Sequence, residues 1–317
     1  MPSLLHYRGW HGVFRGPWWS VWPIARVSLG VLLRRWLFWI LYGPFGLLLF
    51  LMFFFGTFLL SWAESQINVI ANDGKMANLV RGVGRALSIL NGSQNTFQYY
   101  FSYQGSILIV TLALVGAIMV GNDYTFRCLT FYLAKPIGRW HYILGKCLAV
   151  FIIVQMLATL PALLLFAQHV FDDWSYLTDV HYFATNGGGP GGVVLLLGVL
   201  GYGTILSVFL SILLVATASW MRRTMPLIMV WMSLFIFMRL LSNLLVDNLK
   251  LDVHWRLIDL WNNLTLLGQA CLGFAHEKIS TSAPQPEFWE AGLTLAGVCV
   301  VCLIYLNHRT RGVEIVR

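Results

Sequence analysis

The chain has 317 residues, of which 58% are hydrophobic, 15% are aromatic and only 11% are charged. An ordinary soluble domain has about 25% charged residues, so this composition argues against a soluble protein and is typical of a membrane protein. The net charge of +8 does not indicate nucleic-acid binding, because the basic residues lie near predicted membrane ends, where orientation and anionic lipid account for them.

Residues 1–35 are predicted to form a cytoplasmic N-terminus and an interfacial helix, and we expect no cleaved signal peptide. A tryptophan-rich stretch and Pro23 precede a helical segment in which Arg26, Gly30 and Arg34 share one face. Tryptophan at head-group level and arginine near phosphate are typical of a helix lying on the membrane. The helix is either a topogenic anchor or an elbow that moves with a transport cycle. Its apolar residues are predicted on another face: Ile24, Val27 and Val31.

Six apolar segments between residues 36 and 306 are long enough to cross a membrane. A hydrocarbon core about 30 Å thick requires roughly 20 apolar residues of helix. These segments are apolar on every side, whereas barrel strands alternate, so the expected fold class is all-α, a polytopic bundle of six transmembrane helices. The first segment crosses either with a tilt or with a kink at Gly43 and Pro44. The predicted spans are residues 36–62, 103–120, 147–167, 193–220, 225–246 and 288–306.

Charge distribution predicts the orientation of this six-span bundle. The side that holds both termini, including the tail 307–317, has fourteen Lys and Arg, whereas the other side has six. That other side has eleven of the thirteen acidic residues. By the positive-inside rule both termini are cytoplasmic, and we expect the protein in a bacterial inner membrane.

The connection between the second and third spans has more order than a plain loop needs. Phe126, Leu129, Thr130 and Leu133 recur at helical spacing, and Pro136 ends that helix. The pattern predicts a short helix that protrudes into the cytoplasm and presents an apolar stripe to a partner.

In this connection the chain resembles the permease subunits of the ABC-2 family of ABC transporters. Their pattern is an Asp at the inner end of span two, a short coupling helix, and then Leu-x-x-Pro-x-x-Arg-x-x-Tyr-x-x-Gly-Lys. The matching residues here are Asp123, Leu133, Pro136, Arg139, Tyr142, Gly145 and Lys146. The segment before span one, the six-span layout and the basic tail are similar more weakly, so the resemblance covers most of the chain.

The resemblance implies the membrane subunit of an export pump, with two permease subunits, identical or different, each gripping a cytoplasmic ABC ATPase. ATP and Mg²⁺ are expected on that ATPase, and no catalytic residue, cofactor or metal is expected in this chain. The glycine-rich stretch 187–192 agrees, because it lacks the Lys and Ser/Thr of a phosphate-binding loop. The expected ATPase-coupling residues are Asp123, Phe126, Arg127, Leu129, Leu133, Pro136, Arg139, Tyr142, Gly145 and Lys146.

Two features inside the spans have alternative interpretations. Arg239 lies within span five, and a charge inside a span indicates a functional residue by default. It either snorkels to the outer head groups or bonds Asn243, or it faces substrate or a second subunit. Gly203, Ser207 and Ser211 recur every four residues in span four. Such small residues favour close helix packing, and the alternative is the polar wall of a substrate path or a subunit interface.

The outer loops contain two further helical patterns. Residues 78–90 predict a short surface helix, and residues 257–267 predict an amphipathic helix that either lies on the membrane or partly re-enters it. The five cysteines lack metal-site spacing and are expected to face lipid or to pack. Two other functions stay open: a non-transporting assembly or force-transmitting factor, and a membrane-embedded lipid enzyme, for which no acid, base or metal cluster is visible.

Overall fold

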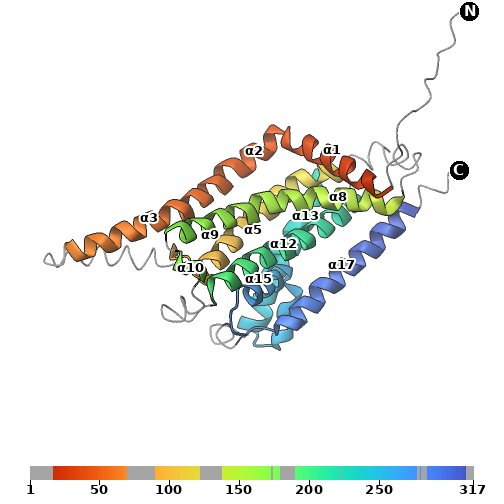
Figure 1. Ribbon diagram of the computed structural model, residues 1–317. Coiled ribbons are helices and arrows are strands. Elements are labelled where there is room, and N and C mark those ends of the chain that lie inside the picture. Colours follow the sequence, from red (N-terminus) through yellow and green to blue (C-terminus); the bar gives the residue numbers. More distant parts are fainter. Residues whose placement is uncertain are drawn as a thin grey trace, which may run out of the picture.

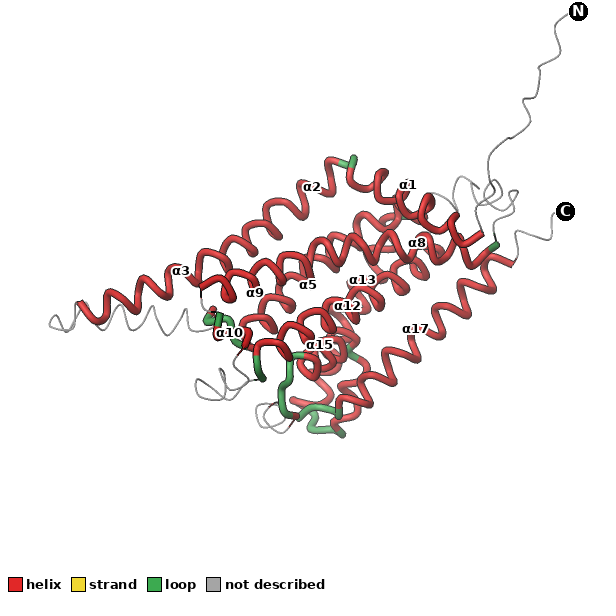
Figure 2. Tube along the Cα trace, viewed as in Figure 1, coloured by secondary structure: helices red, strands yellow, loops and turns green. Residues whose placement is uncertain are grey.

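In a computed structural model, the described part of the chain consists almost entirely of helices (Figures 1 and 2). Within the described part every regular element is a helix, which confirms the predicted all-α class. The described residues are 17–69, 90–121, 138–172, 174–178, 190–221, 223–276, 279 and 284–311. The predicted surface helix at 78–90 therefore lies almost entirely outside them.

Among the described residues, six helical segments are long and apolar enough to cross a membrane, which agrees with the predicted number of spans. Each segment overlaps one predicted range. Most of the segments are longer than predicted, because polar residues continue the helix beyond the apolar stretch. The segments are Trp36–Leu59, Gln94–Gly121, Arg139–Asp172, Gly192–Met221, Thr224–Asn248 and Phe288–Thr310.

Several spans are built from more than one helical element. Span one comprises α2 (Trp36–Tyr42), a π turn η2 (Gly43–Leu47) and α3 (Leu48–Val69), and span two comprises α5 (Gln94–Gly116) and η4 (Ala117–Gly121). Span three comprises α8 (Arg139–Val154), η5 (Gln155–Thr159) and α9 (Leu160–Asp172). Span four is α12 (Gly192–Met221) and span six is α17 (Phe288–Arg311). Span five comprises α13 (Thr224–Met232), η6 (Ser233–Phe237), α14 (Met238–Asn243) and η7 (Leu244–Asn248).

Proline explains two of the π turns. Because proline has no N–H, the carbonyl four residues earlier loses its helical donor and the turn widens. Pro44 lies in η2, at the predicted kink of span one, and Pro161 follows η5 in span three. The carbonyl of Leu157 is thereby released from the helix and available to a neighbouring span.

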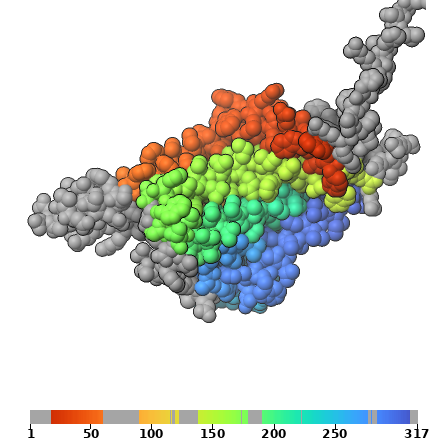
Figure 3. All heavy atoms as spheres, viewed as in Figure 1, coloured from red at the N-terminus to blue at the C-terminus, as the bar shows by residue number. Residues whose placement is uncertain are grey.

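The spans differ in how deeply they are buried. In the most apolar part of span two 73% of residues are buried, whereas the proportion is 17% in spans five and six. In Figure 3 the N-terminal helices and the C-terminal helix lie on opposite sides of the middle segments. Spans two, three and four thus form the centre of the bundle, and spans one, five and six expose most of their surface.

Four shorter helical elements complete the described structure. The 3-10 turn η1 (Pro17–Ser20) leads into α1 (Val21–Leu33), α10 (Ser175–Thr178) follows span three, and η8 (Val253–Ile258) leads into α15 (Leu260–Cys271). The start of α1 and the end of α17 lie at the same end of the bundle (Figure 1).

Helix α15 occupies the segment for which two membrane placements are predicted. Leu264 and Leu266 are buried, and the helix packs against α12 and α17. Gly268 lets the Tyr202 ring of α12 approach the α15 backbone closely. The helix is therefore part of the bundle and not a helix lying separately on the membrane.

Candidate functional site

The motif between spans two and three is only partly covered by the described residues. Its first part, which includes Asp123, Phe126, Arg127, Leu129, Leu133 and Pro136, lies outside them. Its second part, Arg139, Tyr142, Gly145 and Lys146, occupies the first turns of α8. The structure therefore describes only the end of this motif, where the third span begins.

Helix α8 starts abruptly at Arg139. The preceding Gly138 has extended backbone angles (φ −72°, ψ 159°), so the chain enters the helix through a bend. Residues three and four apart share a face of a helix, so Tyr142, Gly145 and Lys146 point together into the bundle. Tyr142 is 1% exposed and Lys146 is 4% exposed. A lysine buried this deeply is uncommon unless its ammonium group has a partner.

Lys146 bonds the end of the preceding span. Its Nζ donates a 2.9 Å hydrogen bond to the carbonyl oxygen of Met119 in η4. A buried ammonium group needs hydrogen-bond acceptors in place of water, and this carbonyl oxygen is one of them. The same Nζ lies 5.8 Å from the centre of the Tyr142 ring. This bond joins the two spans directly at the ends of the connection.

Gly145 brings a third element to the same place. A methyl group added at Gly145 would lie 2.8 Å from Ile24 Cβ, closer than real contacts allow, and 3.1 Å from the Val21 carbonyl oxygen, which is tighter than most. Helix α1 therefore rests directly on the backbone of α8. The Trp18 ring, 4.7 Å from that of His141, adds a second contact between these segments. We call the assembly of α1, η4 and the start of α8 the junction.

The orientation of α1 differs in part from the prediction. The face that contacts the bundle consists of buried Ile24, Ala25, Ser28 and Leu32. Arg26 is exposed as expected, but Val27 and Val31 are exposed too, so they do not share the buried face with Ile24. A helix at a membrane can expose apolar residues on its outer side, because that side meets lipid.

A second set of polar contacts links the first three spans. Gln104 Nε2 donates to the carbonyl oxygen of Leu157 at 2.7 Å, and the Tyr42 hydroxyl donates to the same oxygen at 2.8 Å. This oxygen is the one released by Pro161. These bonds were not predicted from the sequence. The signal that would have indicated them is Pro161 within the span, because a proline leaves the carbonyl four residues earlier without its helical donor.

The small residues of span four lie inside the protomer. Gly203 packs against Thr159 of η5, and both serine hydroxyls are used within α12. Ser207 donates to the Gly203 carbonyl and Ser211 donates to the Val208 carbonyl, at 2.7 and 2.8 Å respectively. Gly203 therefore lets spans three and four pack closely, and the two serines are buried within the protomer.

Arg239 is exposed on α14, and the bond to Asn243 considered from the sequence is absent among the described residues. It interacts electrostatically with Asp259, which caps the start of α15. Arg239 therefore faces α15 and α5 and does not bond along its own helix.

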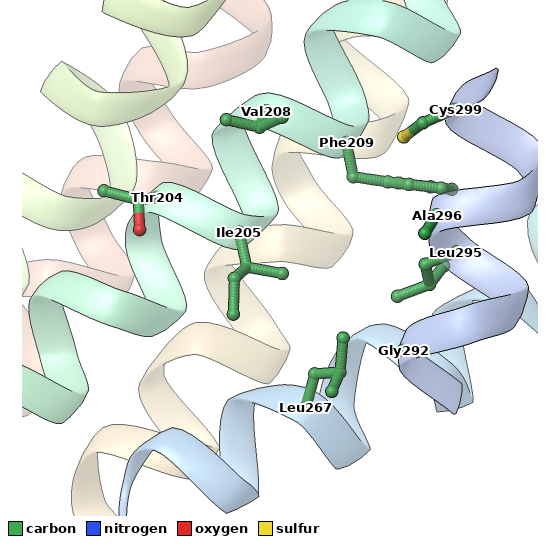
Figure 4. A pocket seen from close by; sticks show the side chains of 9 residues that line it. All are labelled: Thr204, Ile205, Val208, Phe209, Leu267, Gly292, Leu295, Ala296 and Cys299. Atoms are coloured by element: carbon green, nitrogen blue, oxygen red, sulfur yellow. The ribbon is translucent and has the colours of Figure 1, made fainter. Parts of the chain in front are cut away.

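A separate cavity of about 300 Å³ lies between α12, α15 and α17 (Figure 4). Its lining is apolar except for Thr204, whose hydroxyl donates to the Gly201 carbonyl at 2.8 Å, and Cys299. No charged residue lines this cavity, so it suits an apolar ligand or an acyl chain.

Six apolar spans with a junction at one end define a multi-pass membrane protein. The sequence profile of the ABC-2 family transporter proteins matches residues 22–303, which include α1 from its second residue, the rest of the junction and the larger part of span six. The chain belongs to the ABC-2 transporter family and is a membrane permease component of an ABC transporter, a transport subunit and not itself the catalytic one. A search of curated proteins gave no match.

Proposed function

We propose that this chain is the permease subunit of an ABC export pump whose ATPase is a separate polypeptide. The observation that supports this most directly is the junction, where Lys146 bonds Met119 and Gly145 receives α1. Because spans two and three are bonded to each other, a displacement of the connection between them is transmitted to both spans. Helix α1, which packs on span three, moves with these spans. A loosely held connection would absorb the same push.

In this proposal the ATPase docks on the predicted coupling helix around Phe126, Leu129 and Leu133. ATP and Mg²⁺ are bound by the ATPase, and its closure drives the coupling helix against the junction. A second permease subunit, identical or different, completes the pump. Spans one and five, with 22% and 17% of their most apolar parts buried in the protomer, have surface free for such a subunit or for lipid.

The proposed location is a bacterial inner membrane with both termini in the cytoplasm. The excess of Lys and Arg on the side of the termini supports this orientation, because basic loops are retained on the cytoplasmic side. The described beginning and end of the chain lie at the same end of the bundle (Figure 1), as this orientation requires.

Cysteine labelling tests the orientation. In a variant without the native cysteines, a membrane-impermeant thiol reagent applied to intact cells should label a cysteine at Asn186 or Ser282 but not at Arg139 or Arg222. After the cells are opened, all four positions should react. Labelling of position 139 from outside would contradict the six-span orientation.

Leu129→Glu tests the docking of the ATPase. A carboxylate at the centre of an apolar contact loses its water without gaining a partner, and interface centres of this kind cost more than about 2 kcal/mol, or more than tenfold in affinity. We expect normal amounts of the variant in the membrane but at least a tenfold loss of ATP-hydrolysing protein captured with the tagged chain from its native host.

The matched control for this experiment is Leu129→Met, which preserves an apolar side chain of similar volume and should capture the ATPase normally. If Leu129→Glu captured as much ATPase as the unmodified chain and supported the same transport, the segment would not be the docking site.

A further inference from the structure

A groove between spans two and five combines an apolar and a polar half. The apolar half has a volume of about 290 Å³ and the polar half about 310 Å³. Both are lined by Ser106 of α5, Arg239 of α14 and Trp261 of α15, so the two halves meet at these residues. A molecule that fills both must have an apolar part and a polar part.

The two halves lie at different depths in the bundle. The apolar half reaches toward the middle of the spans, past Ile109, Ala113, Trp231, Phe235 and Ile236. The polar half lies toward the end that holds α15, where it is lined by Gln98, Tyr99, Ser102, Asn262 and Gln269. Tyrosines at this level are typical of the boundary between hydrocarbon and head groups.

Arg239 lies where the two halves meet. It follows the start of α13 by 15 residues, or about 22 Å of helix, in a hydrocarbon core about 30 Å thick. The backbone of Arg239 therefore lies about 8 Å below the head groups on the α15 side, and its long side chain can extend toward them. Groove residues around it, Leu240 and Ile236, are 63% and 47% exposed, so the groove is open to the surface of the protomer.

The charge of Arg239 is not neutralised by contact. Among the described residues it makes no hydrogen bond or ion pair. Asp259 attracts it from a distance, but that carboxylate is 3% exposed and accepts hydrogen bonds from the backbone N–H groups of Trp261 and Asn262 at 2.9 and 3.2 Å. The guanidinium is therefore available to an anion at the head-group level.

A second copy of the chain would not supply that anion at this face. In a two-fold interface the same surface meets itself, so the groups facing Arg239 would come from the same face of the partner. The exposed side of span five offers no acid before Asp247, and Asp247 is bonded to Arg256 at 2.6 Å. The phosphate of a lipid lies at the head-group level and matches the bidentate donors of arginine.

We propose that this groove binds an anionic glycerophospholipid from the leaflet on the α15 side. Its phosphate lies against Arg239, its glycerol and head group occupy the polar half, and one acyl chain lies along the apolar half. The site goes beyond the proposed export function, because lipid binding here requires neither an ATPase nor transport.

Photo-crosslinking in nanodiscs tests this site. The full chain, with benzoylphenylalanine at Ile236, is placed in equal amounts of phosphatidylglycerol and phosphatidylcholine with identical acyl chains, and the adducts are identified by mass. We expect several-fold more phosphatidylglycerol than phosphatidylcholine in the adducts. Arg239→Gln should reduce this preference to roughly the ratio of the membrane, and Arg239→Lys should retain part of it.

The matched control has the photoreactive residue at Val300, which is 54% exposed on α17, where adducts should follow the membrane ratio in every variant. Equal adducts of both lipids at Ile236 in the unmodified chain would overturn the proposal, and this result does not depend on the folding of any arginine variant. A crosslink mainly to a second copy would also overturn it, since the groove would then be covered by protein. Failure of the ATPase capture described above would leave this result unaffected.

Discussion

Gly145→Ala is expected to destabilise the protein, whereas Gly30→Ala is expected to leave its stability unchanged or raise it slightly. At Gly145 the added methyl group would lie 2.8 Å from Ile24 Cβ and 3.1 Å from the Val21 carbonyl oxygen. Because both neighbours are held by the helix α1, the helix must move, and overpacking of this kind costs about 1–3 kcal/mol. At Gly30, on the same α1, a methyl group meets no heavy atom within 4 Å.

The measurement is the melting temperature of each purified variant in the same detergent. Replacing glycine in a helix stabilises by up to about 1 kcal/mol where the space is free, so the two substitutions should change the melting temperature in opposite directions. A melting temperature for Gly145→Ala equal to or above that of the unmodified chain would mean that α1 does not rest on α8.

The spans could be predicted because their signal is local. A run of about 20 apolar residues has few structures open to it in a bilayer, since every backbone group must be bonded within the segment or to a neighbour. The π turn in span one was indicated likewise by Gly43 and Pro44, where the sequence predicts a possible kink. Neither prediction needed information about which helices are neighbours.

The neighbours of each face could not be predicted in the same way. Ile24 is buried whereas Val27 and Val31 of the same helix are exposed, although all three are apolar. Lipid is as apolar as the protein interior, so hydrophobicity does not distinguish a residue that faces lipid from one that packs. The pattern predicted that α1 has polar and apolar sides but not which apolar residues contact α8.

Polar partners inside the bundle were missed for a related reason. Lys146 and Gln104 both bond backbone carbonyl oxygens, those of Met119 and Leu157, and a carbonyl has no letter in the sequence. Arg239 was considered with Asn243 because the two are four residues apart, whereas the fold brings α15 and Asp259 toward it. Contacts between distant segments depend on packing that spacing along one helix does not encode.

Lys146→Met is expected to separate the stability of the junction from its role in transmission. Methionine keeps the apolar stem and similar volume but removes the ammonium donors, so the Met119 carbonyl loses its 2.9 Å hydrogen bond. Replacing a buried charge by an apolar group also removes a desolvation penalty, so the net effect on stability should be small, within about 1–2 kcal/mol. The bond between the two spans, however, is lost.

In the complex with the ATPase, we therefore expect Lys146→Met to retain normal assembly while transport per ATP hydrolysed falls several-fold. The matched control is Arg223→Met, which removes a basic group from the exposed turn between α12 and α13 and should change neither quantity. Lys146→Ala, which also leaves a void, should lower the melting temperature further than Lys146→Met. If force passes through the bond between Lys146 and Met119, its loss must lower transport per ATP. Normal transport per ATP in Lys146→Met would therefore show that the lysine only fills space.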